Sequence, residues 1–231
     1  PSIDAYLGLT SSRWENYVRT MLGPERFDQL VSRTPLQRFY GYFSRDILRT
    51  ALQAPGILEA ASLSRVYTTN GTRKLKGALP RAYTVSHYSI TADEQSSLDA
   101  LQSAGLPLTG SVVLEDASPG FASAASPAAA GDAVIDLYSA NEVVVTVNVT
   151  VPSLLVLTDA YYPGWEATIG GEEVPIWRAN SLFRAVEVPA GRHAVTFAYR
   201  PATLSRGFWA TLFSLVLVSA LLVWRGGRAG G

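Results

Sequence analysis

An uncharged, mostly apolar run near the C-terminus constrains this chain more than any other feature. Residues 207–224 read GFWATLFSLVLVSALLVW and contain no Asp, Glu, Lys or Arg. At about 1.5 Å per residue, a helix of this length covers roughly 27 Å, close to the ~30 Å hydrocarbon core of a bilayer. The run therefore predicts a single C-terminal transmembrane helix, and the alternative is a buried core helix.

The ends of this run carry side chains typical of membrane interfaces. Tryptophans lie near both ends, where aromatic belts form, and arginines flank it in equal number on the two sides. The positive-inside rule thus leaves the orientation open, but the whole N-terminal part must lie on one side of the bilayer. The predicted membrane anchor consists of Arg206, Trp209, Trp224 and Arg225.

Composition excludes several classes of function. The 19 basic residues balance 19 acidic ones, and no basic run is present that could bind nucleic acid by counterion release. There is no cysteine, which rules out disulfides, thiolate metal ligands and cysteine nucleophiles within the chain. The 48% apolar content is enough for a packed core.

The first part of the chain, residues 1–56, is predicted to be helical. Residues 12–22 carry apolar side chains at helical spacing, and a capping box that starts at Thr34 predicts another helix. Aromatic residues recur along this segment, and we expect them to dock a partner protein. Trp14 and Tyr17 are the candidate contacts.

Residues 57–116 have the pattern of a small α/β unit. Residues 82–90 alternate as a strand does, and Thr91 with Glu94 form a capping box for a helix that ends at Gly105. A short apolar strand candidate follows this helix. Strand, helix and strand at this spacing predict one compact unit.

The composition and the residue pattern change after residue 116. Residues 117–131 read ASPGFASAASPAAAG, a low-complexity sequence that predicts a linker. Residues 132–201 then alternate short apolar runs with turn residues, which predicts an antiparallel β-sandwich of about seven strands. The fold class is α+β, with the transmembrane helix (207–224) at its end. The predicted strands are 133–139, 142–151, 154–158, 165–169, 174–177, 182–188 and 193–199.

Several short motifs stand out in the second half of the chain. They are YYPGW (161–165), PIWRAN (175–180), LFR (182–184), PAGRH (189–193), YRP (199–201) and, upstream, ALPRAY (78–83). These motifs resemble the C-terminal end of the YfhO family of bacterial membrane proteins, in which a hydrophobic helix also follows directly. The resemblance extends, with gaps, over about residues 60–224.

The resemblance implies an extracytoplasmic location for residues 1–205 and a cytoplasmic C-terminus in the bacterial inner membrane. Family members resemble large multi-pass glycosyltransferases that use lipid-linked sugars, with catalytic acids between N-terminal membrane helices. None of those helices is in this chain, so no catalytic residue carries over. Where the family tends to have a charged hairpin, this chain has Ile169-Gly170-Gly171-Glu172.

The aromatic residues of the second half are the remaining candidate contacts. Those around the Pro163-Gly164 turn could stack on a sugar ring, but we favour packing at one end of the sandwich. We expect no metal and no cofactor, because His87 and His193 lack ligand spacing. The candidate ligand or partner contacts are Tyr161, Tyr162, Trp165, Trp177 and Arg178.

The carboxylates near this motif give little support for catalysis. Asp159, Glu166, Glu172 and Glu173 could supply an acid–base pair for glycoside chemistry, but Glu172-Glu173 is most simply a solvated hairpin. Two functions follow. The first is a non-catalytic accessory subunit that packs on other membrane proteins of an energy-transducing or transport complex. The second is the C-terminal accessory domain of a YfhO-like glycosyltransferase.

Overall fold

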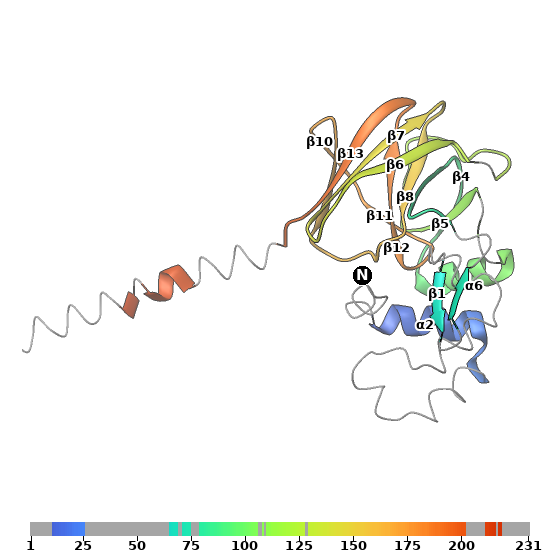
Figure 1. Cartoon of the computed structure of the whole chain (residues 1–231), viewed down its shortest axis with the longest axis horizontal. Helices are drawn as coiled ribbons and strands as arrows, with labels where there is room; N and C mark the ends of the chain where they lie inside the picture. The colour runs from blue at the N-terminus through green and yellow to red at the C-terminus, as the bar shows by residue number, and fades with distance from the viewer. Residues whose placement is uncertain are drawn as a thin grey trace, which may run out of the picture.

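Two β-sheets packed face to face form the body of the protein, and two helices lie beside one of them (Figure 1). This computed structural model describes residues 11–25, 65–68, 71–74, 79–105, 108, 110–127, 129–201, 211–215 and 217–218. The helices are α2 (Ser11–Leu22) and α6 (Glu94–Ala104). The predicted helix over residues 12–22 is thus confirmed.

The first sheet is fully antiparallel, in the order β10-β9-β13-β7-β6. The strand predicted at 142–151 is clearly alternating: Val143, Val145, Val147 and Val149 are buried, and the residues between them are more exposed. The strands are β6 (Gly131–Tyr138), β7 (Glu142–Val149), β9 (Trp165–Ile169), β10 (Glu172–Val174) and β13 (Gly191–Tyr199).

The second sheet has the order β3-β8-β12-β11-β5-β4. Its pairs are antiparallel except β4–β5, which are parallel and joined through α6. Each of the five residues of β8 is buried, because this sheet is covered on both faces. The strands are β3 (Ala82–Val85), β4 (His87–Thr91), β5 (Ser111–Glu115), β8 (Ser153–Leu157), β11 (Trp177–Ala179) and β12 (Phe183–Val188).

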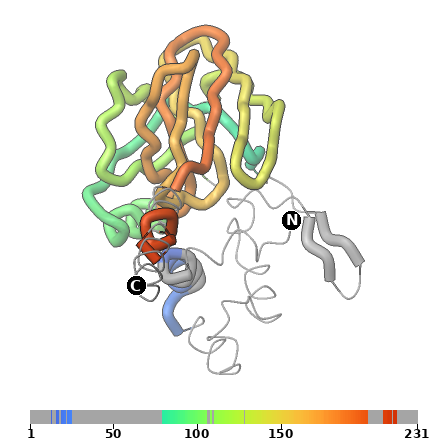
Figure 2. Tube along the Cα trace, turned by 90° about the vertical axis from the view of Figure 1, so that its left-hand side faces the viewer, coloured from blue at the N-terminus to red at the C-terminus, as the bar shows by residue number. Residues whose placement is uncertain are grey.

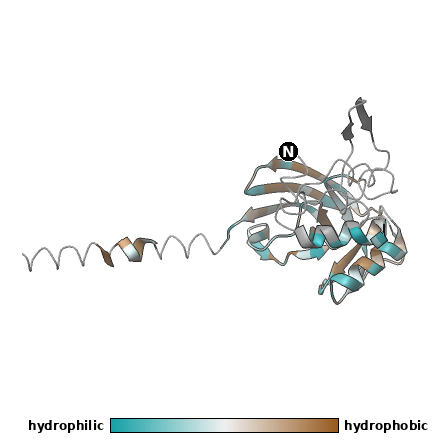
Figure 3. Cartoon of the chain, turned by 90° about the horizontal axis from the view of Figure 1, so that it is seen from below, coloured by the Kyte–Doolittle hydropathy of each residue, from teal (hydrophilic) through white to brown (hydrophobic). Residues whose placement is uncertain are grey.

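Two hydrophobic cores result from this layering. One lies between the sheets and includes Val145, Leu155 and Phe197. The other lies between the six-stranded sheet and the helices, where Tyr17 and Leu98 pack beside Leu114. Figure 3 shows hydrophilic and apolar residues alternating along the helices, as expected for helices with one buried side.

The expectation of a separate small α/β unit is corrected by the strand pairing. β3 pairs with β8, and β5 pairs with β11, so strands from both sides of residues 117–131 share one sheet. Figure 2 shows the green segments before these residues and the yellow and orange segments after them in the same body. The sandwich therefore includes β3, β4 and β5 as well as the predicted strands, and the chain from 174 to 179 forms two strands rather than one.

The Ala/Ser/Pro-rich segment is an ordered strap rather than a flexible linker. Its Ser123 hydroxyl donates to the Tyr88 carbonyl and accepts from the Tyr88 amide, each at 2.8 Å. The Tyr88 hydroxyl donates to the Phe121 carbonyl, and the two rings meet edge to face at 5.3 Å. The Gly120 amide donates to Glu187 at 2.8 Å. The strap thereby covers the edge of β4, which would otherwise be open to pairing.

The start of α6 differs from the expected capping box. Asp93, not Thr91, is the N-cap: its side chain accepts from the Ser96 amide at 2.8 Å, and the Ser96 hydroxyl reaches back to the cap. Thr91 still belongs to β4. Gly105 ends the helix as predicted, with a φ of +76°.

β1 (Arg65–Thr68) and β2 (Gly71–Lys74) form a small antiparallel hairpin. Two predictions fall wholly or partly outside the described residues. The helix predicted from Thr34 lies outside the described residues. Within the run 207–224, residues 211–215 and 217–218 are described and are helical, and among the described residues no helix is long and apolar enough to cross a membrane.

Candidate functional site

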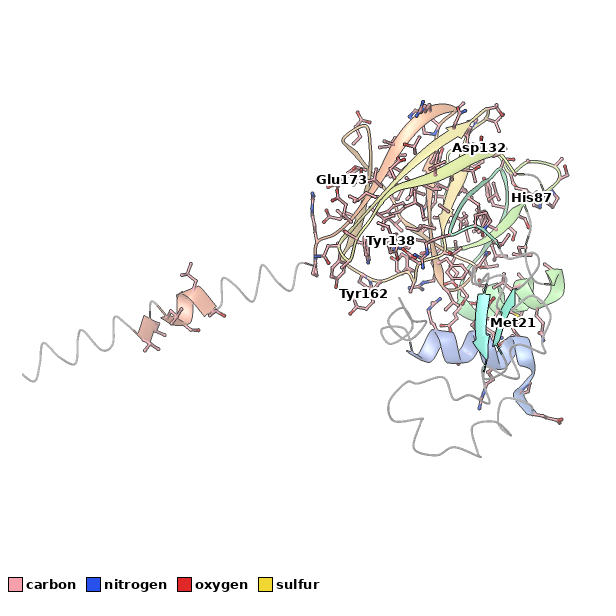
Figure 4. The ribbon with its side chains drawn as sticks, viewed as in Figure 1. Met21, His87, Asp132, Tyr138, Tyr162 and Glu173 are labelled. Atoms are coloured by element: carbon pink, nitrogen blue, oxygen red, sulfur yellow. The ribbon has the colours of Figure 1, made fainter. Side chains whose placement is uncertain are left out.

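The aromatic motif lies at the end of the sandwich where β13 ends and the chain continues toward the C-terminal apolar run. The ring of Tyr199, the last residue of β13, lies 6.2 Å from the ring of Tyr162 and 5.5 Å from that of Trp165. All three side chains are half-buried. Figure 4 shows Tyr162 and Tyr138 toward this end and Asp132 toward the other.

The turn of the motif is fastened to the departing chain. The Arg200 amide donates to the Gly164 carbonyl at 2.6 Å. Gly164 has a φ of +101°, and a Cβ there would stand 3.1 Å from both the Pro201 Cα and the Tyr199 ring. Glycine is needed at this position for both reasons: its backbone conformation strains other residues, and the space is filled. The YYPGW turn therefore clamps the chain as it leaves the sandwich.

A buried ion pair lies behind the aromatic rings. The Arg184 Nη2 donates to the Asp159 Oδ2 at 3.0 Å, and the side chains are 2% and 4% exposed. The guanidinium lies 4.0 Å from the centre of the Trp165 ring and 5.6 Å from that of Phe197. A cation stacked on aromatic faces in a dry site is favourably placed. The pair thus joins β12 to the inter-sheet core beneath the motif.

Asp159 has two further neighbours nearer the surface. The Tyr138 hydroxyl lies 3.3 Å from both carboxylate oxygens, and Arg81 Nε lies 3.8 Å away. Arg81 also lies 4.6 Å from the Tyr138 ring centre. Burial raises the pKa of Asp159 above its usual value, although Arg184 and then Arg81 oppose this shift.

A second charged network lies on the side of the motif that faces α2. Glu115 is 6% exposed and accepts from Arg13 at 2.8 Å and from Arg178 at 3.3 Å. Arg13 also contacts Glu94 at 3.2 Å. The Arg178 guanidinium in turn lies 4.4 Å from the ring centre of Tyr161. The network ties α2, α6, β5 and β11 to the first tyrosine of the motif.

The structure brings together four of the predicted contact residues. Tyr161 lies with Arg178, and the next residue, Tyr162, contacts the ring of Tyr199, which also contacts Trp165. Trp177 lies apart from them, half-buried against the core beside the helices.

The remaining predicted contacts lie elsewhere. Tyr17 is 1% exposed and packs inside the core beside the helices, which corrects the expectation that it contacts a partner. The side chain of Trp14 lies outside the described residues, as do Arg206, Trp209, Trp224 and Arg225.

Sequence reasoning considered Asp159 only as a catalytic carboxylate and missed the other residues that organise this end. They are Arg184, Arg81, Arg13, Glu115 and Tyr138. One signal was available: Arg184 stands in the apolar run LFRAV, and an arginine within a buried strand requires a partner. The identity of that partner depends on strand pairing that the sequence does not reveal.

The other titratable residues occupy ordinary structural positions. Two of the four carboxylates considered for an acid–base pair contact arginines instead. Asp159 binds Arg184, and Glu166 lies 3.4 Å from Arg200. Glu172 and Glu173 are exposed on β10, as expected for a solvated hairpin. No cluster of three metal-ligating side chains occurs among the described residues.

The histidines bind main-chain oxygens. His87 Nδ1 lies 2.6 Å from the carbonyl oxygen of Ala124 in the strap, and His193 Nε2 lies 3.2 Å from that of Ala190. The His87 contact joins β4 to the strap, and the His193 contact lies within one turn. Both histidines are thus accounted for by local structure.

Comparisons with known proteins agree with the motifs of this end. Residues 115–211 match the family model described as "Bacterial membrane protein YfhO". Comparisons with curated proteins and with solved structures gave no match. The matched range contains the strap, the YYPGW clamp and β6 to β13. The match therefore confirms, over residues 115–211, the resemblance to the YfhO family of bacterial membrane proteins that the motifs indicate.

Proposed function

We propose that this chain is a non-catalytic, extracytoplasmic β-sandwich region of a bacterial inner-membrane protein, held close to the bilayer by the helix that follows β13. Its role is to pack against other membrane-protein segments and keep them in a fixed position relative to the bilayer. The family match supports the membrane location.

The clamp between Gly164 and Arg200 is the observation that carries the proposal. A freely swinging tether would not need its first residues to be fixed to the sandwich. Here Arg200 is hydrogen-bonded to Gly164, and the Tyr199 ring packs on that of Trp165. The Tyr199 amide is also bonded to the Asn141 carbonyl at 2.8 Å. A region fastened in this way transmits its orientation to the chain that continues from it.

Two arrangements fit this role. In one, the chain is a separate subunit of an energy-transducing or transport complex. In the other, it is the C-terminal accessory domain of a YfhO-like glycosyltransferase that uses lipid-linked sugars. The YfhO match over residues 115–211 is compatible with the second arrangement.

Purification from bacterial membranes in mild detergent, followed by intact mass measurement, separates these arrangements. A polypeptide much heavier than 24.8 kDa that contains this sequence would establish the glycosyltransferase arrangement. A chain near 24.8 kDa in fixed ratio with other membrane proteins would establish the subunit arrangement.

Sidedness is tested by cysteine labelling, because the chain has no cysteine of its own. We expect an E173C variant, at an exposed position of β10, to react with a membrane-impermeant maleimide in intact spheroplasts. An A229C variant in the C-terminal tail is the matched control and should react only after detergent is added. The reverse pattern would overturn the proposal.

A further inference from the structure

We infer that the aromatic end of the sandwich, defined as Tyr138, Tyr161, Tyr162, Trp165 and Tyr199, lies against the lipid headgroups of the membrane. This inference rests on the proposed function, because it requires the run after β13 to enter the bilayer. The partner is the phosphate and glycerol layer of the same membrane, not a second protein.

The first argument is the length of the tether. Five residues, 202–206, separate Pro201 from the uncharged run. Even fully extended at ~3.3–3.6 Å per residue, they reach less than roughly 20 Å. Because Gly164 holds Arg200, none of β13 can detach to lengthen this tether without breaking the clamp. The end that carries the motif is therefore the end nearest the hydrocarbon.

The second argument is the chemistry of the side chains at this end. Tyrosine and tryptophan combine an apolar ring with a polar tip, which is why they gather at membrane interfaces. The rings of Tyr161, Tyr162, Trp165 and Tyr199 are half-buried, and Tyr138 is 37% exposed. They are held by one another and by guanidinium groups, so an ordered surface is presented without refolding.

The third argument is charge. Arg200 and Arg81 expose 70% and 38% of their side chains at this end, and arginine binds phosphate oxygens well. Glu166 and Glu142 lie close by on β9 and β7, so the end is not strongly cationic. Zwitterionic lipid headgroups match this mixed charge, and contact does not require anionic lipid.

The test places a fluorescent probe at each end of the sandwich in the full chain. A140C lies in the turn before β7, beside Asn141, which bonds Tyr199. T150C lies in the turn after β7, at the other end, and both positions are exposed. Each variant is labelled with bimane and reconstituted in phosphatidylcholine nanodiscs that contain lipid with a nitroxide on the headgroup.

We expect the nitroxide lipid to quench the probe at position 140 at least about two-fold, and the probe at 150 to be unaffected. Equal quenching at both positions, or none at 140, would overturn the inference. Protection of position 140 from both the nitroxide lipid and aqueous iodide would also overturn it, because a protein would then cover this end.

A second pair of variants tests the aromatic residues themselves. In the A140C background, Tyr162→Ala should reduce quenching by the nitroxide lipid, and Tyr162→Trp should restore it. Unchanged quenching in Tyr162→Ala would contradict a role for the ring. Maleimide labelling of E173C reports sidedness independently, so loss of lipid contact with normal sidedness would refute this inference and leave the proposed function standing.

Discussion

The Arg200 amide donates to the carbonyl oxygen of Gly164 at 2.6 Å, and this bond extends the antiparallel pairing of β13 with β9 by one pair beyond Tyr199 and Trp165. This bond closes the YYPGW turn over the segment that leaves β13. Gly164 is packed between the Tyr199 ring and Pro201, so the turn and the exit form one unit. The motif therefore acts on the position of the chain that follows, and its aromatic rings stabilise that position.

Substitution of Gly164 tests this contact. In Gly164→Ala, the new Cβ lies 3.1 Å from the Pro201 Cα, a backbone atom that cannot move without opening the clamp. We expect the free energy of unfolding to fall by about 2–4 kcal/mol, from backbone strain and overpacking together. Denaturant titration in detergent, followed by circular dichroism, measures this loss.

Gly171→Ala is the matched control for that experiment. Gly171 has a similar φ of +90°, but nothing lies within 4 Å of the added Cβ. Strain alone should cost about 1–2 kcal/mol. Equal losses in the two variants would mean that the contact with Pro201 contributes nothing.

The buried ion pair gives a second prediction. Arg184→Met leaves Asp159 buried beside Arg81 and Tyr138. We expect the free energy of unfolding at neutral pH to fall by about 3–5 kcal/mol, because a buried charge loses its partner. Asp159→Asn added to Arg184→Met should recover part of the loss, and thermal unfolding of the three proteins measures this.

Arg200→Met provides the exposed counterpart. The Arg200–Glu166 pair lies at 3.4 Å, with side chains 70% and 43% exposed. Such a pair contributes about 0–1 kcal/mol, so the variant should unfold close to the wild type. If Arg184→Met were equally mild, burial of the pair would not be important for stability.

The raised pKa of Asp159 predicts a pH dependence of stability. Burial is the main cause, and Arg184 and Arg81 oppose it. Because the folded pKa lies above the unfolded value near 3.8, the folded protein favours the protonated carboxyl. Its contribution to stability is complete below the unfolded pKa and is lost as the pH rises through the folded pKa.

Asp159→Asn removes this titration and is the reference for the measurement. Urea unfolding of both proteins from pH 3.5 upward should show the wild type losing stability relative to Asp159→Asn as the pH rises, and then levelling. A difference that stays constant, or that grows in favour of the wild type, would show that the arginines outweigh burial.

The fold of the sandwich could be predicted from sequence where periodicity was strong. The alternating valines of β7 identified it, because one face is buried and the other is not. The long-range pairings were not predictable. β5 pairs with β11 through only Arg178↔Glu115 and Ala179↔Leu114, and nothing in either short strand signals the other. A separate unit was therefore expected where the chain adds strands to an existing sheet.

The site was predictable in part for the same reason. The YYPGW motif was identified because three aromatic residues stand around a Pro-Gly pair, and its turn is where Pro163-Gly164 predicts it. Its charged neighbours come from distant strands: Arg13 and Glu115 are separated by 102 positions. Composition also misled the prediction for the strap, since Ala, Ser and Pro are typical of linkers whether or not hydrogen bonds hold them.

The strap provides the last prediction, because one short side chain supplies two of its hydrogen bonds to β4. Ser123→Ala removes the acceptor of the Tyr88 amide and the donor to the Tyr88 carbonyl. We expect hydrogen exchange of the Tyr88 amide to accelerate about tenfold, since local opening of the strap becomes easier by about 1–1.5 kcal/mol. Ser126→Ala, an exposed position of the same strap, is the control and should leave exchange unchanged. If Ser123→Ala exchanged at the wild-type rate, packing of Phe121 on Tyr88 would hold the edge without these bonds.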